Sequence, residues 1–127
     1  MAMVQKVLVG VVALLFALLG VRWMFAPVSV AGDLGIVLGS AEALNTARGD
    51  LGGMFLAAAG LCALGLRSGD GRWLQAVAAV VGCVALGRLV GIALDGFSAT
   101  AGLSITVELV MVAILLSAAR QPAPSAA

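Results

Sequence analysis

The feature that most constrains this sequence is a series of long apolar runs in which no side chain is charged. The runs are Val7–Val21, Leu51–Leu66, Trp73–Gly87, Gly96–Val107 and Leu109–Ala119. Inside a lipid bilayer only helices and closed barrels satisfy every backbone polar group, so such runs indicate one or the other. A membrane barrel requires apolar and polar residues to alternate, and these runs do not alternate. The runs therefore predict membrane helices.

Composition supports the same conclusion. Hydrophobic residues make up 63% of the chain and charged residues only 10%, whereas a soluble domain is about 45–50% apolar and about 25% charged. So few charges cannot cover the surface of a compact soluble domain, and disordered chains lack this apolar content. Seven basic residues against six acidic ones leave a formal charge of +1, which gives no basic surface for nucleic acid. We expect an all-α integral membrane bundle whose surroundings are the lipid bilayer.

Four transmembrane helices are the simplest division of the chain. None of the runs alone reaches the roughly 18 residues that mark a span by themselves, so each span must include flanking residues or an internal charge. We predict one membrane domain over residues 1–120, with helices at about 4–23, 49–66, 73–94 and 101–119, an interfacial loop or short helix at 24–48, and a disordered tail at 121–127.

Basic residues predict the orientation of the chain. Lys6, Arg67, Arg72 and Arg120 fall at one set of helix ends, and loops rich in lysine and arginine stay in the cytoplasm. We therefore expect cytoplasmic N and C termini. A cleaved signal peptide ending at Ser29-Val30-Ala31 is the weaker alternative, because Arg22 and Trp23 interrupt it. Trp23, Trp73 and Phe97 are predicted to form interfacial aromatic belts.

Two opposite charges are expected at equal depth in neighbouring helices. Arg88 lies seven residues before Asp95, and Glu108 lies seven residues after Ala101, so each is roughly 10 Å from the same interface. An isolated charge in hydrocarbon is costly, and a pair between Arg88 and Glu108 is the natural inference. Asp95 shares a helix face with Arg88. Arg48, Asp50, Arg88, Asp95 and Glu108 form the predicted intramembrane polar cluster.

This cluster has two interpretations. It is either an ion-pair network that fixes the register of the helices, or a polar pocket that binds a ligand head group or couples to protons. Small residues give a weaker signal: Gly53, Gly87 and Gly91 lie in stripes at four-residue spacing, which let helices pack closely within the bundle or in a homodimer.

Several chemistries are excluded or disfavoured. The chain has no histidine, so it lacks histidine-based metal sites and general bases, and no serine–histidine or cysteine–histidine nucleophile can form. Cys62 and Cys83 are expected at different depths, which argues against a disulfide, and two thiols do not make a zinc site. We predict no catalytic residues, no metal and no cofactor, and thus a protein that is not an enzyme.

The same residues resemble a known family. Asn45-Thr46-Ala47-Arg48 with Gly52-Gly53, then Gly87-Arg88-Leu89 with Asp95-Gly96, and finally Glu108-Leu109 are similar to motifs of the domain-of-unknown-function 4345 family. This family consists of small bacterial membrane proteins. The pattern of the chain is also distantly similar to that of DoxX-like four-helix proteins, which is a weaker comparison. The resemblance extends from the first helix to about Leu116, and it implies four helices in the bacterial inner membrane. It implies no activity.

These observations predict a binding or accessory role. We expect either a module that binds a lipid or another hydrophobic small molecule, or an accessory subunit of a larger membrane complex. The alternative is a small proton-coupled transporter that uses Glu108. Small multidrug-resistance transporters carry their glutamate in the first helix, where this chain has no acidic residue between Lys6 and Arg22. An arginine next to Glu108 also favours its ionised form.

Overall fold

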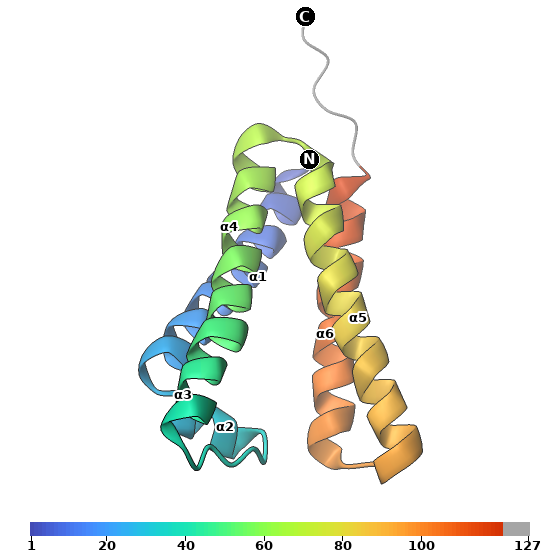
Figure 1. Ribbon diagram of the computed structural model, residues 1–127. Helices are drawn as coiled ribbons and strands as arrows, with labels where there is room; N and C mark the ends of the chain where they lie inside the picture. Colours follow the sequence, from blue (N-terminus) through green and yellow to red (C-terminus); the bar gives the residue numbers. More distant parts are fainter. Residues whose placement is uncertain (121–127) are drawn as a thin grey trace, which may run out of the picture. The chain divides into compact units, whose positions relative to one another are not determined.

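The computed structural model describes residues 1–120, and this part of the chain contains helices and no strand (Figure 1). The elements are α1 (Met3–Phe25), α2 (Pro27–Asp33), α3 (Ala41–Thr46), the π-helical segment η1 (Ala47–Gly52), α4 (Gly53–Ser68), α5 (Gly71–Asp95) and α6 (Ala99–Ala119). Four helical stretches are long and apolar enough to cross a membrane: Met3–Phe25, Ala41–Ser68, Gly71–Asp95 and Ala99–Ala119. The predicted all-α fold class with four membrane helices is confirmed.

The second long helix begins earlier than predicted. We expected it near Gly49, but α3, η1 and α4 follow one another without a break from Ala41. Ser40 explains the early start, because its hydroxyl accepts a hydrogen bond from the backbone N–H of Ala43 at 3.0 Å and caps the helix. The segment 24–48, predicted as an interfacial loop or short helix, therefore contains the two short helices α2 and α3. The predicted disordered tail lies outside the described residues.

Contacts divide the chain into two compact units. The hairpin unit comprises Met1–Gly10 and the chain from Leu61 onward, and the α2 unit comprises Val11–Gly60. That the chain forms a single membrane domain stays a prediction.

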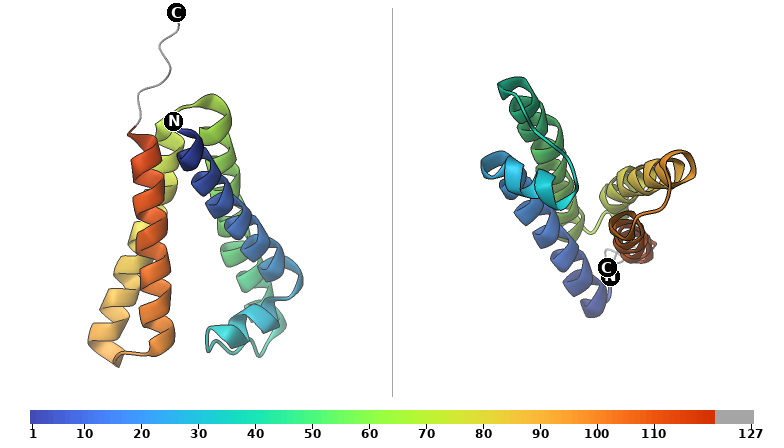
Figure 2. Two further views of the ribbon diagram at one scale, coloured as in Figure 1. Left: turned by 180° about the vertical axis from the view of Figure 1, so that it is seen from behind. Right: turned by 90° about the horizontal axis from the view of Figure 1, so that it is seen from below.

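In the hairpin unit, α5 and α6 run antiparallel and side by side (Figures 1 and 2). Leu74 and Val77 on α5 and Leu115 on α6 are each almost completely buried. The side-chain amide of Gln5 donates a hydrogen bond to the carbonyl oxygen of Ser117 at 3.2 Å. This bond brings the start of α1 to the end of α6.

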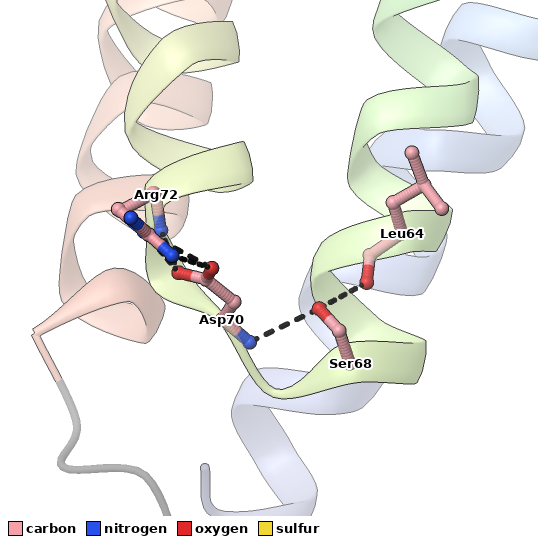
Figure 3. Close-up of polar contacts among 4 residues, drawn as sticks. All are labelled: Leu64, Ser68, Asp70 and Arg72. Carbon is pink, nitrogen blue, oxygen red and sulfur yellow. Dashed lines mark hydrogen bonds and ion pairs between the residues drawn. The ribbon is translucent and has the colours of Figure 1, made fainter.

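Side-chain hydrogen bonds shape the turn between α4 and α5 (Figure 3). Ser68 donates from its hydroxyl to the carbonyl of Leu64 at 2.7 Å and accepts from the backbone N–H of Asp70 at 3.2 Å. Asp70 caps α5 by accepting from the backbone N–H of Arg72, and it also pairs with the Arg72 guanidinium at 2.8 Å. Gly69 has a φ of 73°, which suits glycine in this tight connection.

Asp70 gives this turn a pH dependence. The side-chain hydrogen bond from Arg72 lowers the pKa of Asp70 below its ordinary value. A carboxyl group with a lowered pKa stabilises the fold above its unfolded-state pKa, and this contribution disappears as the pH falls through the folded-state value. We expect acid to lower the melting temperature of the wild type slightly more than that of Asp70→Asn. Parallel melting curves in detergent check this, and identical acid sensitivities would contradict it.

The α2 unit has its own small core. Trp23, Val30, Ala31 and Ala47 are buried together, with Phe55 packed at the edge. Trp23 is only 1% exposed, so its predicted place in an interfacial aromatic belt is wrong. The apolar face of α2 covers the indole ring of Trp23. The sequence pattern does not predict that this short helix folds back against Trp23.

Candidate functional site

The hairpin unit contains an ion pair between two membrane helices. Arg88 on α5 donates from Nε to Oε1 of Glu108 on α6 at 2.7 Å. The side chain of Glu108 is 13% exposed and that of Arg88 is 33% exposed. The pair expected from the equal depth of the two residues is therefore present, and its short charge-assisted hydrogen bond joins the two arms of the hairpin.

Both partners keep unused hydrogen-bonding capacity. Oε2 of Glu108 is buried and has no hydrogen-bond partner among the described residues. Neither Nη of Arg88 donates a hydrogen bond within residues 1–120. A guanidinium can bind a carboxylate through two parallel hydrogen bonds, but here only one forms. The pair is thus incompletely satisfied on both sides.

Asp95 does not join this pair. It is the last residue of α5 and is exposed, and within the described residues it forms no ion pair. Although Asp95 lies on the same helix face as Arg88, two helical turns separate them. Among the described residues, the ion-pair partner of Arg88 is Glu108 and not Asp95.

Arg48 lies in the α2 unit and has a different partner. Its guanidinium donates to the carbonyl oxygen of Met24, at the end of α1. The last carbonyls of a helix have no partner within the helix, and Met24 is the next-to-last residue of α1. Arg48 supplies the missing donor. The π-helical turn of η1, in which Arg48 lies, is a local irregularity of the kind often found at functional positions.

Replacing Arg48 with alanine is expected to lower the free energy of unfolding by about 1.5–2 kcal/mol, because a charged donor to the Met24 carbonyl is lost. The matched control is Arg22→Ala, which removes an ion pair to Asp33 whose side chains are 47% and 67% exposed. We expect that control to cost less than about 1 kcal/mol. Denaturant titration in detergent measures both, and equal losses would contradict the assigned role of Arg48.

Asp50 is exposed and lines an open groove of about 570 Å³ in the α2 unit. Glu42, Thr46 and Leu51 are also among the lining residues. The five predicted polar residues are therefore divided between the units: Arg88, Asp95 and Glu108 belong to the hairpin unit, and Arg48 and Asp50 to the α2 unit. One direct contact, between Arg88 and Glu108, joins two of them.

The predicted packing glycines do not lie at close approaches within their own units. A Cβ atom added at Gly53, Gly87 or Gly91 would meet nothing within 4 Å. The tight positions are elsewhere. At Gly52 an added Cβ would lie 3.1 Å from the Met24 side chain, and at Gly71 it would meet the backbone of Ala119. Four-residue spacing identifies helix faces that are made of small residues, but it does not predict which of these faces contacts another helix.

Sequence reasoning also missed the bond from Arg48 to Met24 and the ion pair of Arg22 with Asp33. Charge and spacing could have suggested the second, because Arg22 and Asp33 flank a short segment that contains Pro27. Cys62 and Cys83 are both free thiols, which agrees with the expected absence of a disulfide. The described residues contain no cluster of three or more acidic or cysteine side chains that could hold a metal ion.

Comparison with known proteins places this arrangement in a family. The family model described as a domain of unknown function (DUF4345) matches residues 4–119, which include α4, the hairpin of α5 and α6, and nearly all of α1. No curated protein and no solved structure matches the chain. Since the family match covers nearly the whole chain, including Arg48, Arg88 and Glu108, the chain belongs to the domain-of-unknown-function 4345 family.

Proposed function

We propose that this protein is a non-enzymatic membrane module that binds a hydrophobic small molecule through the polar head of that molecule. The observation that carries the proposal is the incomplete ion pair: Arg88 has two unused Nη groups and Glu108 has a buried Oε2 without a partner. A buried pair that serves stability alone repays its desolvation only when its remaining hydrogen-bonding groups are satisfied. Unused donors on a one-third-exposed Arg88 suit a ligand that supplies an acceptor.

In this function the two residues have separate roles. Arg88 binds the head group through its Nη donors, because its Nε is already engaged. Glu108 is a positioning residue, since its carboxylate holds the guanidinium at a fixed place between α5 and α6. The surrounding helix surface is apolar, with Leu89 and Val107 exposed, and such a surface suits a hydrocarbon tail.

Native mass spectrometry of the protein in mild detergent tests the proposal. We expect a defined small-molecule adduct on the wild type and its loss in Arg88→Ala. Arg67→Ala is the matched control, because Arg67 is exposed at the end of α4 and we expect it to keep the adduct. A wild type that carries no adduct, also after incubation with total membrane lipid extract, would contradict the binding function.

Loss of the adduct could also follow from unfolding, so a second variant is needed. Arg88→Gln with Glu108→Gln removes both charges together and leaves no unpaired ion between the helices. This double variant is expected to fold and to lack the adduct. If it folds and keeps the adduct, the ligand does not depend on the ion pair, and the proposed site is wrong.

A second candidate function is proton-coupled transport through Glu108. The specific observation in its favour is the buried, unpartnered Oε2, which could carry a proton. Against it, Arg88 already engages the same carboxylate at 2.7 Å. Proton-driven uptake of a fluorescent cationic dye into proteoliposomes, abolished by Glu108→Gln, would favour transport over binding. The accessory-subunit role is favoured instead if a protein partner, and no small molecule, remains bound through purification.

The proposed location is the bacterial inner membrane, with both termini in the cytoplasm. Four basic residues support this orientation. Lys6 lies near the start of α1 and Arg67 near the end of α4, while Arg72 lies near the start of α5 and Arg120 follows the end of α6. Basic residues at these ends favour the cytoplasmic side. Fusion of alkaline phosphatase to the C terminus should give an inactive reporter, whereas an active phosphatase would reverse the proposed orientation.

A further inference from the structure

The charge balance of the Arg88–Glu108 pair restricts the class of ligand. One positive and one negative side chain lie 2.7 Å apart between α5 and α6, so their net charge is zero. The other charged residues of this hairpin are at its ends, where Arg72 pairs with Asp70 and Asp95 is exposed. Among the described residues of α5 and α6, the remaining charges, Arg72 and Asp95, lie at the ends of α5, seven or more residues from Arg88.

A ligand that carries its own charge would therefore leave the site with an unbalanced charge. An unbalanced charge in a membrane interior costs several kcal/mol. A neutral carbonyl group avoids this cost, since its oxygen accepts hydrogen bonds from the unused Nη groups of Arg88 without adding charge. The ionised head of a fatty acid, although it could also accept from Arg88, competes with Glu108 for the same cation.

Within the hairpin unit, the helix face next to Arg88 has no close neighbour. An added Cβ atom would meet nothing within 4 Å at Gly87, the preceding residue, or at Gly91, three residues further along. Because residues three apart share a helix face, the open side at Gly91 adjoins the Arg88 side chain. A straight hydrocarbon chain could lie along this face with its carbonyl at the guanidinium.

We propose that the Arg88–Glu108 site selects neutral, carbonyl-bearing amphiphiles, such as long-chain esters, over the corresponding ionised acids. This inference rests on the proposed binding function and adds the class of ligand. It also gives Glu108 a role in specificity. With Glu108 neutralised, the guanidinium has no counter-ion, and the preference is expected to reverse in favour of the acid.

The test is a competition between two ligands that differ in the head group alone. Wild type and Glu108→Gln are each incubated with an equal mixture of methyl palmitate and palmitate at about pH 9, well above the pKa of a carboxyl group. Native mass spectrometry then gives the ratio of the two adducts. We expect the wild type to prefer the ester by about tenfold or more, the ratio that corresponds to roughly 1.4 kcal/mol, and Glu108→Gln to prefer the acid.

The possible outcomes separate this inference from the function on which it rests. If neither ligand binds the wild type, although a native adduct is present, the ester class is wrong and the binding function stands. If the wild type binds palmitate as well as the ester, the charge-balance argument is overturned, whether or not Glu108→Gln folds. If the wild type prefers the ester and Glu108→Gln keeps that preference unchanged, Glu108 does not set the specificity and the proposal fails.

Discussion

Replacing Arg88 with alanine is expected to lower the free energy of unfolding by about 3 kcal/mol or more, because it leaves the carboxylate of Glu108 without its counter-ion. Glu108 is 13% exposed and its Oε2 already lacks a partner, so no other described group can compensate the charge. Titration with a denaturing detergent, followed by circular dichroism, measures the loss. Arg88→Ala should unfold at a clearly lower denaturant fraction than the wild type.

The double variant Arg88→Gln with Glu108→Gln separates the cost of an orphaned charge from the value of the pair. Removing a whole buried ion pair is often close to neutral, since two desolvated charges disappear together. We therefore expect the double variant to recover most of the stability that Arg88→Ala loses. If the double variant is as unstable as Arg88→Ala, the ion pair itself holds α5 and α6 together, and the structural interpretation of the cluster gains support.

The Arg88–Glu108 pair could be predicted from the sequence because membranes impose a strict geometry. Arg88 is as far from Asp95 as Glu108 is from Ala101, so both residues were expected at the same depth. Because a lone charge in hydrocarbon is costly, two opposite charges at one depth are expected to pair. The four membrane helices followed from hydrophobicity in the same way. In each case one dominant energy term decides the outcome, and it can be evaluated along the chain.

The missed features depend on contacts between residues far apart in the sequence. Arg48 was predicted to belong to the intramembrane polar cluster, but its partner is the Met24 carbonyl near the end of α1. The early start at Ala41 depends on one cap at Ser40 and on a π-helical turn. Each of these features contributes little free energy, about 1 kcal/mol for a cap. Competing conformations differ in free energy by similar amounts, so the sequence alone does not decide between them.

The glycines also show that sequence spacing does not predict contacts between residues far apart in the chain, and they lead to a further prediction. Gly87 and Gly91 satisfied the spacing rule but have open space beside them, whereas Gly71 matches no such motif and lies against α6. A Cβ at Gly71 would lie 2.9 Å from the Cα of Ala119 and 3.0 Å from its carbonyl carbon. Backbone atoms cannot rotate away as a side chain can, so α5 and α6 must separate to accept it.

Gly71→Ala is therefore expected to destabilise the protein by about 2 kcal/mol, within the range for overpacking a close contact. Gly82→Ala, in the middle of α5, is the matched control, because an added Cβ there meets nothing within 4 Å. Alanine favours helix over glycine, so Gly82→Ala should raise stability by roughly 0.5–1 kcal/mol. The two identical substitutions should thus shift the midpoint of detergent unfolding in opposite directions. Equal shifts would mean that α5 and α6 are not in close contact at Gly71.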